Sequence, residues 1–436
     1  MIKELRVENW KSFERATLYI DPLTILIGEN ASGKSNLLEA LDFLQRFAAG
    51  AEIDEVIDGS SVLPPLRGGI ASICRRPADW FALEAVIGES GQPDCRYRVK
   101  VWMDGLRVTA FEESLVRESG HTGDGLAGEE RLFWTERLDE EDRLRPQGEV
   151  HRLLGEIEYR VPANGHKAHW KTASGKIEAT LATGIRRTFL EFLPSLDVGD
   201  PVRIVVNRVA SALRQVFVLD PIASTMRKTA RLSERLERDG SNVAGVLAAL
   251  GTERRAAVEA QLTRYLQVVP ERDIRRVWAQ PVDLLAKEAM LYCEEGWPGA
   301  PIQIIDAYTM SDGTLRYLVI VAAMLLRPPG SLLVVEDVDS GLHPSRACTL
   351  LEMLRTLGKE RRIDVLVTTH NPALLDAAGM RMVPFITVAH RDDTTGASRL
   401  TPLEDIDQLP KLSAGGSLGQ LESAGRLRAA VAVGPD

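Results

Sequence analysis

The sequence predicts an α/β fold in which a parallel sheet continues into antiparallel strands, and three observations support this. Apolar runs at residues 23–27 (LTILI), 331–335 (SLLVV) and 363–368 (IDVLVT) have the composition of strands buried on both faces. Loop and helix signals follow each run, which is the βαβ rhythm of a parallel sheet. Residues 81–116 instead form three alternating runs separated by turn signals, so we expect an antiparallel meander appended to the first strands.

The other elements follow from local patterns. Residues 2–8 and 16–20 read as short strands, and a helix is expected from about Lys34, with leucines on one face. Residues 118–130 and 138–150 are rich in glycine and charge and are expected to be exposed loops. Residues 183–266 are expected to be mostly helical, and the tail after about Leu400 ends in a short helix, LGQLESAGRLRAAV.

Composition bounds the class of protein. The 436 residues are 44% hydrophobic and 26% charged, as in ordinary globular proteins. A formal net charge of −9 argues against a surface that is basic everywhere, so any contact with nucleic acid must come from a local patch. No apolar run approaches the ~20 residues of a membrane span, and charges stand where a signal peptide would be apolar. We therefore expect a cytoplasmic protein without a membrane partner.

The four cysteines lie far apart and form no CxxC pair, so we expect buried thiols rather than a zinc site or a disulfide. The histidines at 121, 151, 166 and 169 lie in polar sequence and are expected on the surface. The pair Asp392-Asp393 is expected to form a turn. With 66 residues after His370, we expect no nuclease domain of the Toprim kind.

A phosphate-binding loop is the decisive motif. Residues 28–35 fit G-x-x-x-x-G-K-[ST] between a buried strand and a helix start, where backbone N–H groups can face a β-phosphate. Lys34 would bridge the β- and γ-phosphates, and the Ser35 hydroxyl would bind Mg²⁺. The alternative is a glycine-rich turn without a ligand. The predicted nucleotide-binding residues here are Gly28, Glu29, Asn30, Ala31, Ser32, Gly33, Lys34, Ser35 and Asn36.

Two adjacent acids end the strand LLVV. Side chains alternate along a strand, so Glu336 can face Mg²⁺ while Asp337 orients the attacking water near the γ-phosphate. Alone, such a pair is as often a strand-to-loop exit as a site; beside the loop at 28–35 it indicates ATP chemistry.

Two more segments fit the same chemistry. His370 follows the strand IDVLVT and is positioned to contact a γ-phosphate. Ser311, Asp312 and Gly313 precede a strong helix, and a helix N-terminus is a place where anions bind.

The order of these segments carries a family resemblance. The loop at 28–35, Ser311-Asp312-Gly313, Glu336-Asp337, residues 340–344 (SGLHP) and His370 together resemble the ABC-type ATPases of the RecF, SMC and Rad50 group. The opening LRVENWKSFERATLYIDPLTILIGENASGKSNLLEAL, residues 219–221 with 239–242, and the closing GGSLGQLESAGRL are similar to short RecF-like AAA family ATPases found with bacterial defence and toxin–antitoxin genes. Only about residues 116–200 are unmatched.

The resemblance implies an ABC-type P-loop ATPase head, with a mixed sheet core, an antiparallel β lobe and a largely helical insert. It implies an N-terminal lobe (1–115), an insert (116–285), a C-terminal lobe (286–400) and a tail (401–436). Lys11 and Ser12 would lie near the base or ribose, and Ser311 with Gly313 would reach the γ-phosphate held by a second protomer. Ser340 and Gly341 would cross the dimer interface, and His370 would be the switch histidine. The active unit would be a head-to-tail dimer around two ATP molecules.

The sequence departs from the family at the catalytic position. Asp337 stands where the family usually has Glu, and Val338 stands where it usually has Pro. A carboxylate misplaced by about 1 Å costs roughly 10²-fold in rate, so slow hydrolysis is expected. No glutamine is assigned to the Q-loop.

A basic stretch offers a contact for DNA. Arg227, Lys228, Arg231, Arg235 and Arg238 have spacings of three and four, as on one face of a helix that tracks phosphates. The alternative is a solvated face paired with Glu234 and Glu237. Arg272, Arg275 and Arg276 form a weaker cluster.

The sequence thus predicts an ATPase that acts as sensor or scaffold in antiphage or toxin–antitoxin defence and controls a separately encoded effector. The alternatives are a RecF-like repair ATPase and a largely non-hydrolysing scaffold in which ATP is structural.

Overall fold

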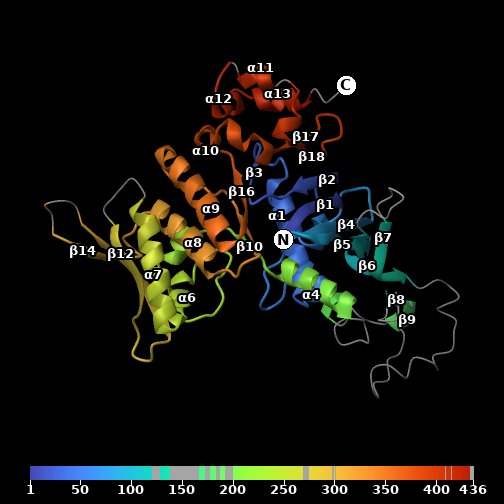
Figure 1. Cartoon of the computed structure of the whole chain (residues 1–436), viewed down its shortest axis with the longest axis horizontal. Coiled ribbons are helices and arrows are strands. Elements are labelled where there is room, and N and C mark those ends of the chain that lie inside the picture. The colour runs from blue at the N-terminus through green and yellow to red at the C-terminus, as the bar shows by residue number, and fades with distance from the viewer. Residues whose placement is uncertain are drawn as a thin grey trace. The chain divides into compact units, whose positions relative to one another are not determined.

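The computed structural model describes residues 1–119, 128–137, 166–171, 177–182, 187–191, 200–268, 274–296, 299, 301–407, 409–413 and 415–432. The chain divides into two compact units, each built from separate segments. Unit 1 comprises residues 1–20, 35–216 and 391–400, and unit 2 comprises residues 21–34, 217–390 and 401–436. These boundaries differ from the predicted lobes, because the β lobe does not end at residue 115 but continues through β9 and α4 (Figure 1). No helix in the described part of the chain is long and apolar enough to cross a membrane.

A parallel sheet forms the centre of unit 2. Its strands follow the order β10, β15, β16, β3, β17, and the pairs β15–β16, β16–β3 and β3–β17 are parallel. Every residue of β3, β15 and β16 is buried, which confirms the prediction of strands covered on both faces. The bounds are β3 Leu23–Ile27, β10 Val216–Leu219, β15 Leu332–Val335, β16 Asp364–Thr369 and β17 Ile386–Arg391.

Helices and a smaller sheet complete unit 2. The long helices α8 and α9 precede and follow β15, and α8 is buried along most of its length because its sequence is apolar nearly all round. In the smaller sheet, β13 pairs antiparallel with β11, β12 and β14. The helices are α5 Ala223–Met226, α6 Val243–Ala249, α7 Thr252–Gln267, α8 Asp312–Leu326, α9 Ala347–Arg361, α10 Pro372–Ala378, α11 Leu409–Ser413, α12 Leu418–Ser423 and α13 Arg426–Ala432; the strands are β11 Ala230–Arg231, β12 Ile274–Pro281, β13 Glu288–Glu295 and β14 Gln303–Asp306.

Unit 1 is a predominantly antiparallel sheet with helices on it. Its strands follow the order β18, β2, β1, β4, β5, β6, β7, β8, β9, which confirms the meander predicted over residues 81–116. The predicted loop at 118–130 is wrong at both ends, because residues 118–119 end β6 and residues 128–130 begin β7, and the two strands pair here. The strands are β1 Ile2–Trp10, β2 Phe13–Tyr19, β4 Trp80–Glu89, β5 Gln92–Asp104, β6 Arg107–Ser119, β7 Gly128–Arg137, β8 His166–Lys171, β9 Ile177–Ala182 and β18 Ser398–Pro402, and the helices are α1 Lys34–Ala48, α2 Ile53–Asp58 and α4 Asp200–Arg214.

Few aromatic residues suffice for the core of unit 1 because they meet edge to face. Trp10 packs against Phe81 and Phe43 with ring centroids 5.1 and 5.8 Å apart, and Phe47 packs against Phe111 at 5.6 Å. Edge-to-face pairs add about 1 kcal/mol each beyond buried area. This cluster joins α1 to β1, β4 and β6.

Two local predictions are corrected. The basic stretch is not a helix face: α5 ends at Met226, residues 230–231 form β11, and the backbones of Arg238 and Asp239 accept hydrogen bonds from Asp220 and Ile222. Those pairings use groups that a helix would need. The tail forms two helices, α12 and α13, because Gly425 adopts φ +65° between them.

The thiols divide. Cys95 and Cys293 are buried and Cys74 is half-buried, as expected of isolated thiols, but Cys348 is exposed on α9. All of them are free, which confirms that no disulfide forms.

Candidate functional site

The loop after β3 adopts a conformation that most residues resist. Gly28, Ala31 and Gly33 have φ of +143°, +63° and +111°, where side chains are rarely tolerated. A Cβ on Gly28 would lie 2.1 Å from the Ala389 carbonyl oxygen, so only glycine fits beside β17. The loop then enters α1 at Lys34.

The loop curls around the ammonium group of Lys34. Its Nζ donates hydrogen bonds to the carbonyl oxygens of Gly28 (2.6 Å) and Glu29 (3.0 Å). Burial lowers the pKa of Lys34, while the carboxylates of Asp337, Glu422, Glu336 and Glu29 raise it. The ammonium is thus held at the mouth of a loop, where a phosphate oxygen could replace a carbonyl.

The hydroxyl of Ser32 gives the same loop a free polar group. Its Oγ is buried and makes no hydrogen bond in the structure. Buried polar atoms are normally satisfied, so such an atom within a glycine-rich loop before a helix fits a phosphate ligand.

Glu336 and Asp337 leave the end of β15 in different environments. Glu336 is buried, and its Oε2 lies 3.6 Å from Nη2 of Arg238. Asp337 is half-exposed and has φ +45°, a strained value for a residue other than glycine. Its N–H donates to Thr368 Oγ1 at 2.9 Å, which fixes this turn against β16.

His370 lies beside the acid at the end of the neighbouring strand. Its Nδ1 is 3.6 Å from Asp337 Oδ1, and its side chain is exposed. Within the turn, Thr369 Oγ1 donates to buried Asp339 Oδ1 at 2.8 Å. Since β15, β16 and β3 are parallel neighbours, their carboxyl ends bring Asp337, His370 and the Lys34 loop to one edge, where ligands of α/β sheets bind.

The donors of this edge suit Mg²⁺ rather than a resident transition metal. No group of three or more His, Cys, Asp or Glu side chains within the described ranges could hold a metal ion by itself. Mg²⁺ uses one or two protein oxygens and takes the rest from phosphates and water. Glu336 carries a carboxylate of this kind in unit 2, and Ser35 directly follows Lys34 in the chain; their roles as Mg²⁺ ligands stay predictions.

The segment 311–313 forms the start of α8, where Ser311 and Asp312 are exposed and Gly313 is buried. Ser311 caps α8, and its Oγ accepts a hydrogen bond from Thr314 N at 3.1 Å. Asp312 pairs with Arg227. A Cβ on Gly313 would lie 2.7 Å from the Gly341 carbonyl oxygen, so this segment and the loop at 340–342 are in backbone contact.

Lys11 and Ser12 lie in unit 1 with Asn36. Lys11 Nζ forms an ion pair with Glu39 of α1 and donates to the Arg67 carbonyl oxygen at 2.7 Å. Ser12 Oγ accepts a hydrogen bond from Asn36 Nδ2 at 2.7 Å. The structure therefore ties both residues to α1, and their predicted approach to a base or ribose stays a prediction.

Other candidates have structural roles. Asp392 Oδ1 accepts hydrogen bonds from the Thr394 hydroxyl and from the backbone N–H groups of Thr394 and Thr395, which confirms the predicted turn. These bonds, the one from the Thr394 hydroxyl above all, hold the pKa of Asp392 well below its usual range. His169 stacks on Trp134 with ring centroids 4.9 Å apart. His121 and His151 lie outside the described residues.

Sequence reasoning missed three residues of the edge. The sequence predicts for Arg238 a contact with DNA phosphates or a solvated face, whereas Arg238 faces Glu336. Glu422 and Arg428, from the C-terminal tail, approach the loop at 28–34. No spacing pattern marks such contacts, because the partners are up to 399 positions apart.

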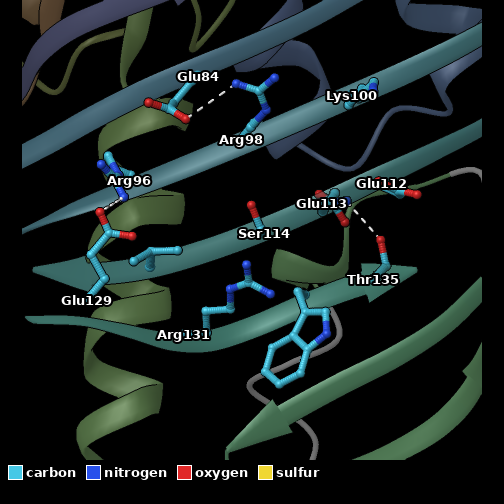
Figure 2. Close-up of a pocket in the computed structure, with 12 residues that line it drawn as sticks. Glu84, Arg96, Arg98, Lys100, Glu112, Glu113, Ser114, Glu129, Arg131 and Thr135 are labelled. Atoms are coloured by element: carbon cyan, nitrogen blue, oxygen red, sulfur yellow. Dashed lines mark hydrogen bonds and ion pairs between the residues drawn. The ribbon is translucent and has the colours of Figure 1, made fainter. Parts of the chain in front are cut away.

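Unit 1 holds a separate polar hollow of about 360 Å³ on the face of β4, β5, β6 and β7 (Figure 2). Figure 2 shows Arg98 directed at Glu84 and Arg96 at Glu129, and these ion pairs measure 3.7 and 2.5 Å. Since cations and carboxylates alternate here, the hollow lacks the excess positive charge of a polyanion site.

Comparisons with known proteins agree with this arrangement. Residues 302–376 match the AAA domain family named for the AbiEii toxin of type IV TA systems, and residues 1–59 match the AAA ATPase domain family. The chain is 27% identical over 401 residues to the DNA replication and repair protein RecF of Anaeromyxobacter dehalogenans (strain 2CP-C), covering 86% of this chain and 94% of that protein. A stretch of 41 residues is 51% identical to RecF of Staphylococcus haemolyticus (strain JCSC1435), covering 9% of this chain and 11% of that protein.

One solved structure shows the fold. The SmcHead bound to the C-winged helix domain of ScpA matches with a TM-score of 0.51 at 11% identity, over 92% of this chain and 97% of that chain. The expected head fold is confirmed, and so is the resemblance to the RecF and SMC group.

Proposed function

We propose that this chain, which resembles the ABC-type ATPases of the RecF and SMC group in fold and motifs, binds and hydrolyses ATP with Mg²⁺. The observation that carries the proposal is the meeting of Lys34, Glu336, Asp337 and His370 at one edge of the unit 2 sheet. A cation, two acids and a histidine at the ends of parallel strands are the groups that phosphoryl transfer to water needs.

Each residue has a definable task. Lys34 exchanges its carbonyl contacts for β- and γ-phosphate oxygens. The water oxygen forms a bond to the γ-phosphorus while the bond from the γ-phosphorus to the bridging oxygen breaks, and Asp337 accepts the proton that the water loses; the products are ADP and phosphate. His370 donates a hydrogen bond to the γ-phosphate. Mg²⁺, held by Ser35 and Glu336, would supply charge neutralisation of the phosphates.

The test is binding and turnover by the purified chain. We expect Lys34→Ala to weaken ATP binding at least about tenfold, because one charge-assisted contact is lost. Asp337→Ala is expected to bind ATP but release no phosphate above background. Arg399→Ala, far along the chain in unit 1, serves as control. If wild type hydrolyses ATP no faster than Asp337→Ala, Asp337 is not the catalytic acid, and a scaffold in which ATP is structural becomes the better description.

We propose further that ATP closes a head-to-tail dimer that controls a separately encoded effector in defence. The match of residues 302–376 to a toxin–antitoxin family supports this role. We expect cells carrying the gene with its neighbouring genes to resist phage, and Lys34→Ala to abolish the resistance. Equal plaque counts for the two strains would refute the defence role while leaving the ATPase proposal intact.

A RecF-like repair function is the second candidate, favoured by a RecF relative that aligns over 94% of its length. Repair predicts tight, salt-sensitive duplex DNA binding by the purified chain alone, with stimulated hydrolysis. If the purified chain bound no duplex DNA even at low salt, the repair function would be excluded.

A further inference from the structure

The C-terminal tail meets the nucleotide loop inside unit 2. Figure 1 shows α12 beside α10, and α13 follows α12 directly. The tail lies more than 380 positions after the loop at 28–34 and belongs to none of the motifs that define the ATPase edge.

The tail is anchored to the helix that follows His370. Gly419 N donates to Asp376 Oδ1 of α10 at 2.6 Å. A Cβ on Gly419 would lie 2.2 Å from the Pro372 carbonyl oxygen, so the two backbones touch and only glycine fits. Ser417 caps α12 and fixes where it begins.

The anchor is apolar as well. Leu418, Leu421 and Leu427 are buried in the same core as Leu374 and Leu375 of α10. Burial removes these three leucine side chains from water, so the tail is packed firmly against α10.

The C-terminal tail carries two oppositely charged side chains near the loop, those of Arg428 and Glu422. Arg428 Nη1 donates to Glu29 Oε2 at 2.8 Å. Burial raises the pKa of Glu422; Glu29 raises it too, while Lys34 lowers it. Glu422 is half-buried on α12, the helix that precedes Arg428, and the charges of Lys34 and Glu29 both act on its carboxylate.

We propose that Glu422 and Arg428 are positioning residues that set the affinity of the loop for a nucleoside triphosphate, Glu422 lowering it and Arg428 raising it. This inference rests on the proposed function. Glu422 stabilises the Lys34 ammonium when no triphosphate is present and repels phosphate oxygens that arrive there. Arg428 neutralises Glu29, whose carboxylate would otherwise oppose the same phosphates.

The experiment measures binding of a fluorescent, non-hydrolysable ATP analogue with Mg²⁺ to the full chain. Glu422→Gln keeps the shape and removes the charge, so we expect about fivefold tighter binding. Arg428→Ala is expected to bind about fivefold more weakly, and Arg428→Lys to recover most of the loss. The exposed neighbours Glu404→Gln and Arg426→Ala, matched in chemistry, are expected to bind like wild type.

The direction of the effect separates this role from a structural one. A tail that merely supports the fold would make Glu422→Gln bind more weakly, together with a lower unfolding temperature. In a double-mutant cycle, Glu29→Gln is expected to remove most of the effect of Arg428→Ala.

Unchanged or weaker binding by Glu422→Gln overturns the inference, provided wild type binds and Lys34→Ala does not. If wild type and Lys34→Ala bind the analogue equally poorly, the proposed function itself fails and this inference falls with it.

Discussion

The residue expected to do the chemistry has a strained backbone. Asp337 has φ +45°, held by its N–H bond to Thr368 Oγ1 and by the bond from Val338 N to the Thr368 carbonyl oxygen. Asp and Asn tolerate this region better than longer side chains. The turn therefore gives a physical reason for Asp where relatives of this kind usually have Glu.

Asp337→Asn tests the carboxylate without disturbing the turn. We expect ATP binding as in wild type and a fall in kcat of about 10²- to 10⁴-fold, because Asn cannot accept the proton. The measurement is phosphate release at saturating ATP, with Asp393→Asn as the control in an exposed turn. A fall of less than threefold would show that another group takes the proton.

A buried carboxyl in unit 1 makes stability depend on pH. Glu113 accepts hydrogen bonds from Thr188 Oγ1 and Phe189 N, each at 2.7 Å, and from the Tyr97 hydroxyl. Burial raises the pKa of Glu113 from 4.5 to about 7. Between these values the folded chain keeps a proton that the unfolded chain has lost.

The free energy of unfolding should therefore fall as pH rises from about 4.5 to about 7, by up to about 1.4 kcal/mol per pH unit from this group. Glu113→Gln imitates the protonated form and should flatten that part of the profile. Urea unfolding of both proteins between pH 4.5 and 8 checks this, with exposed Glu89→Gln as the control. Parallel profiles for wild type and Glu113→Gln would contradict it.

At the scale of elements, the start of α8 is packed directly against the loop after β15. Gly313 and Gly341 are in backbone contact, and Ser311, the cap of α8, is exposed beside them. In the family this chain resembles, these are the surfaces that meet ATP across a dimer. A side chain at Gly313 would have to push the two segments apart.

Gly313→Ala is thus expected to leave ATP binding unchanged and to abolish ATP-dependent dimerisation and turnover. Its Cβ would lie 2.7 Å from the Gly341 carbonyl oxygen, closer than side chains approach. Gly251→Ala, where a Cβ meets nothing within 4 Å, is the matched control. Binding is followed with a fluorescent analogue and size by light scattering. Normal dimerisation of Gly313→Ala would remove this contact from the interface.

For the whole molecule, the proposed cycle links nucleotide to assembly. We expect Asp337→Asn, which holds ATP without cleaving it, to form a stable dimer with ATP·Mg²⁺ and to remain monomeric with ADP. Lys34→Ala is expected to stay monomeric in both. Light scattering after gel filtration measures this, and a dimer of equal amount without nucleotide would contradict an ATP-driven clamp.

The sequence by itself determined the parallel strands and the loop at 28–35. A run such as LTILI has one stable environment, the centre of a covered sheet, and the glycines at 28 and 33 permit a backbone that other residues resist. The places of the acids at 336–337 and of the histidine at 370, at the carboxyl ends of such strands, were also predictable, and their chemistry stays a prediction.

Only the tertiary structure decided which distant groups meet there. Arg238 faces Glu336, and Arg428 faces Glu29. No periodic sequence pattern predicts these contacts, because the partners are far apart in the chain. The basic stretch at 227–238 shows the converse: its spacing is helical, but its backbone pairs with residues 220–222 and with β13. Local spacing fixes what a segment can form by itself, whereas burial and backbone pairing with the rest of the chain fix what it forms in the fold.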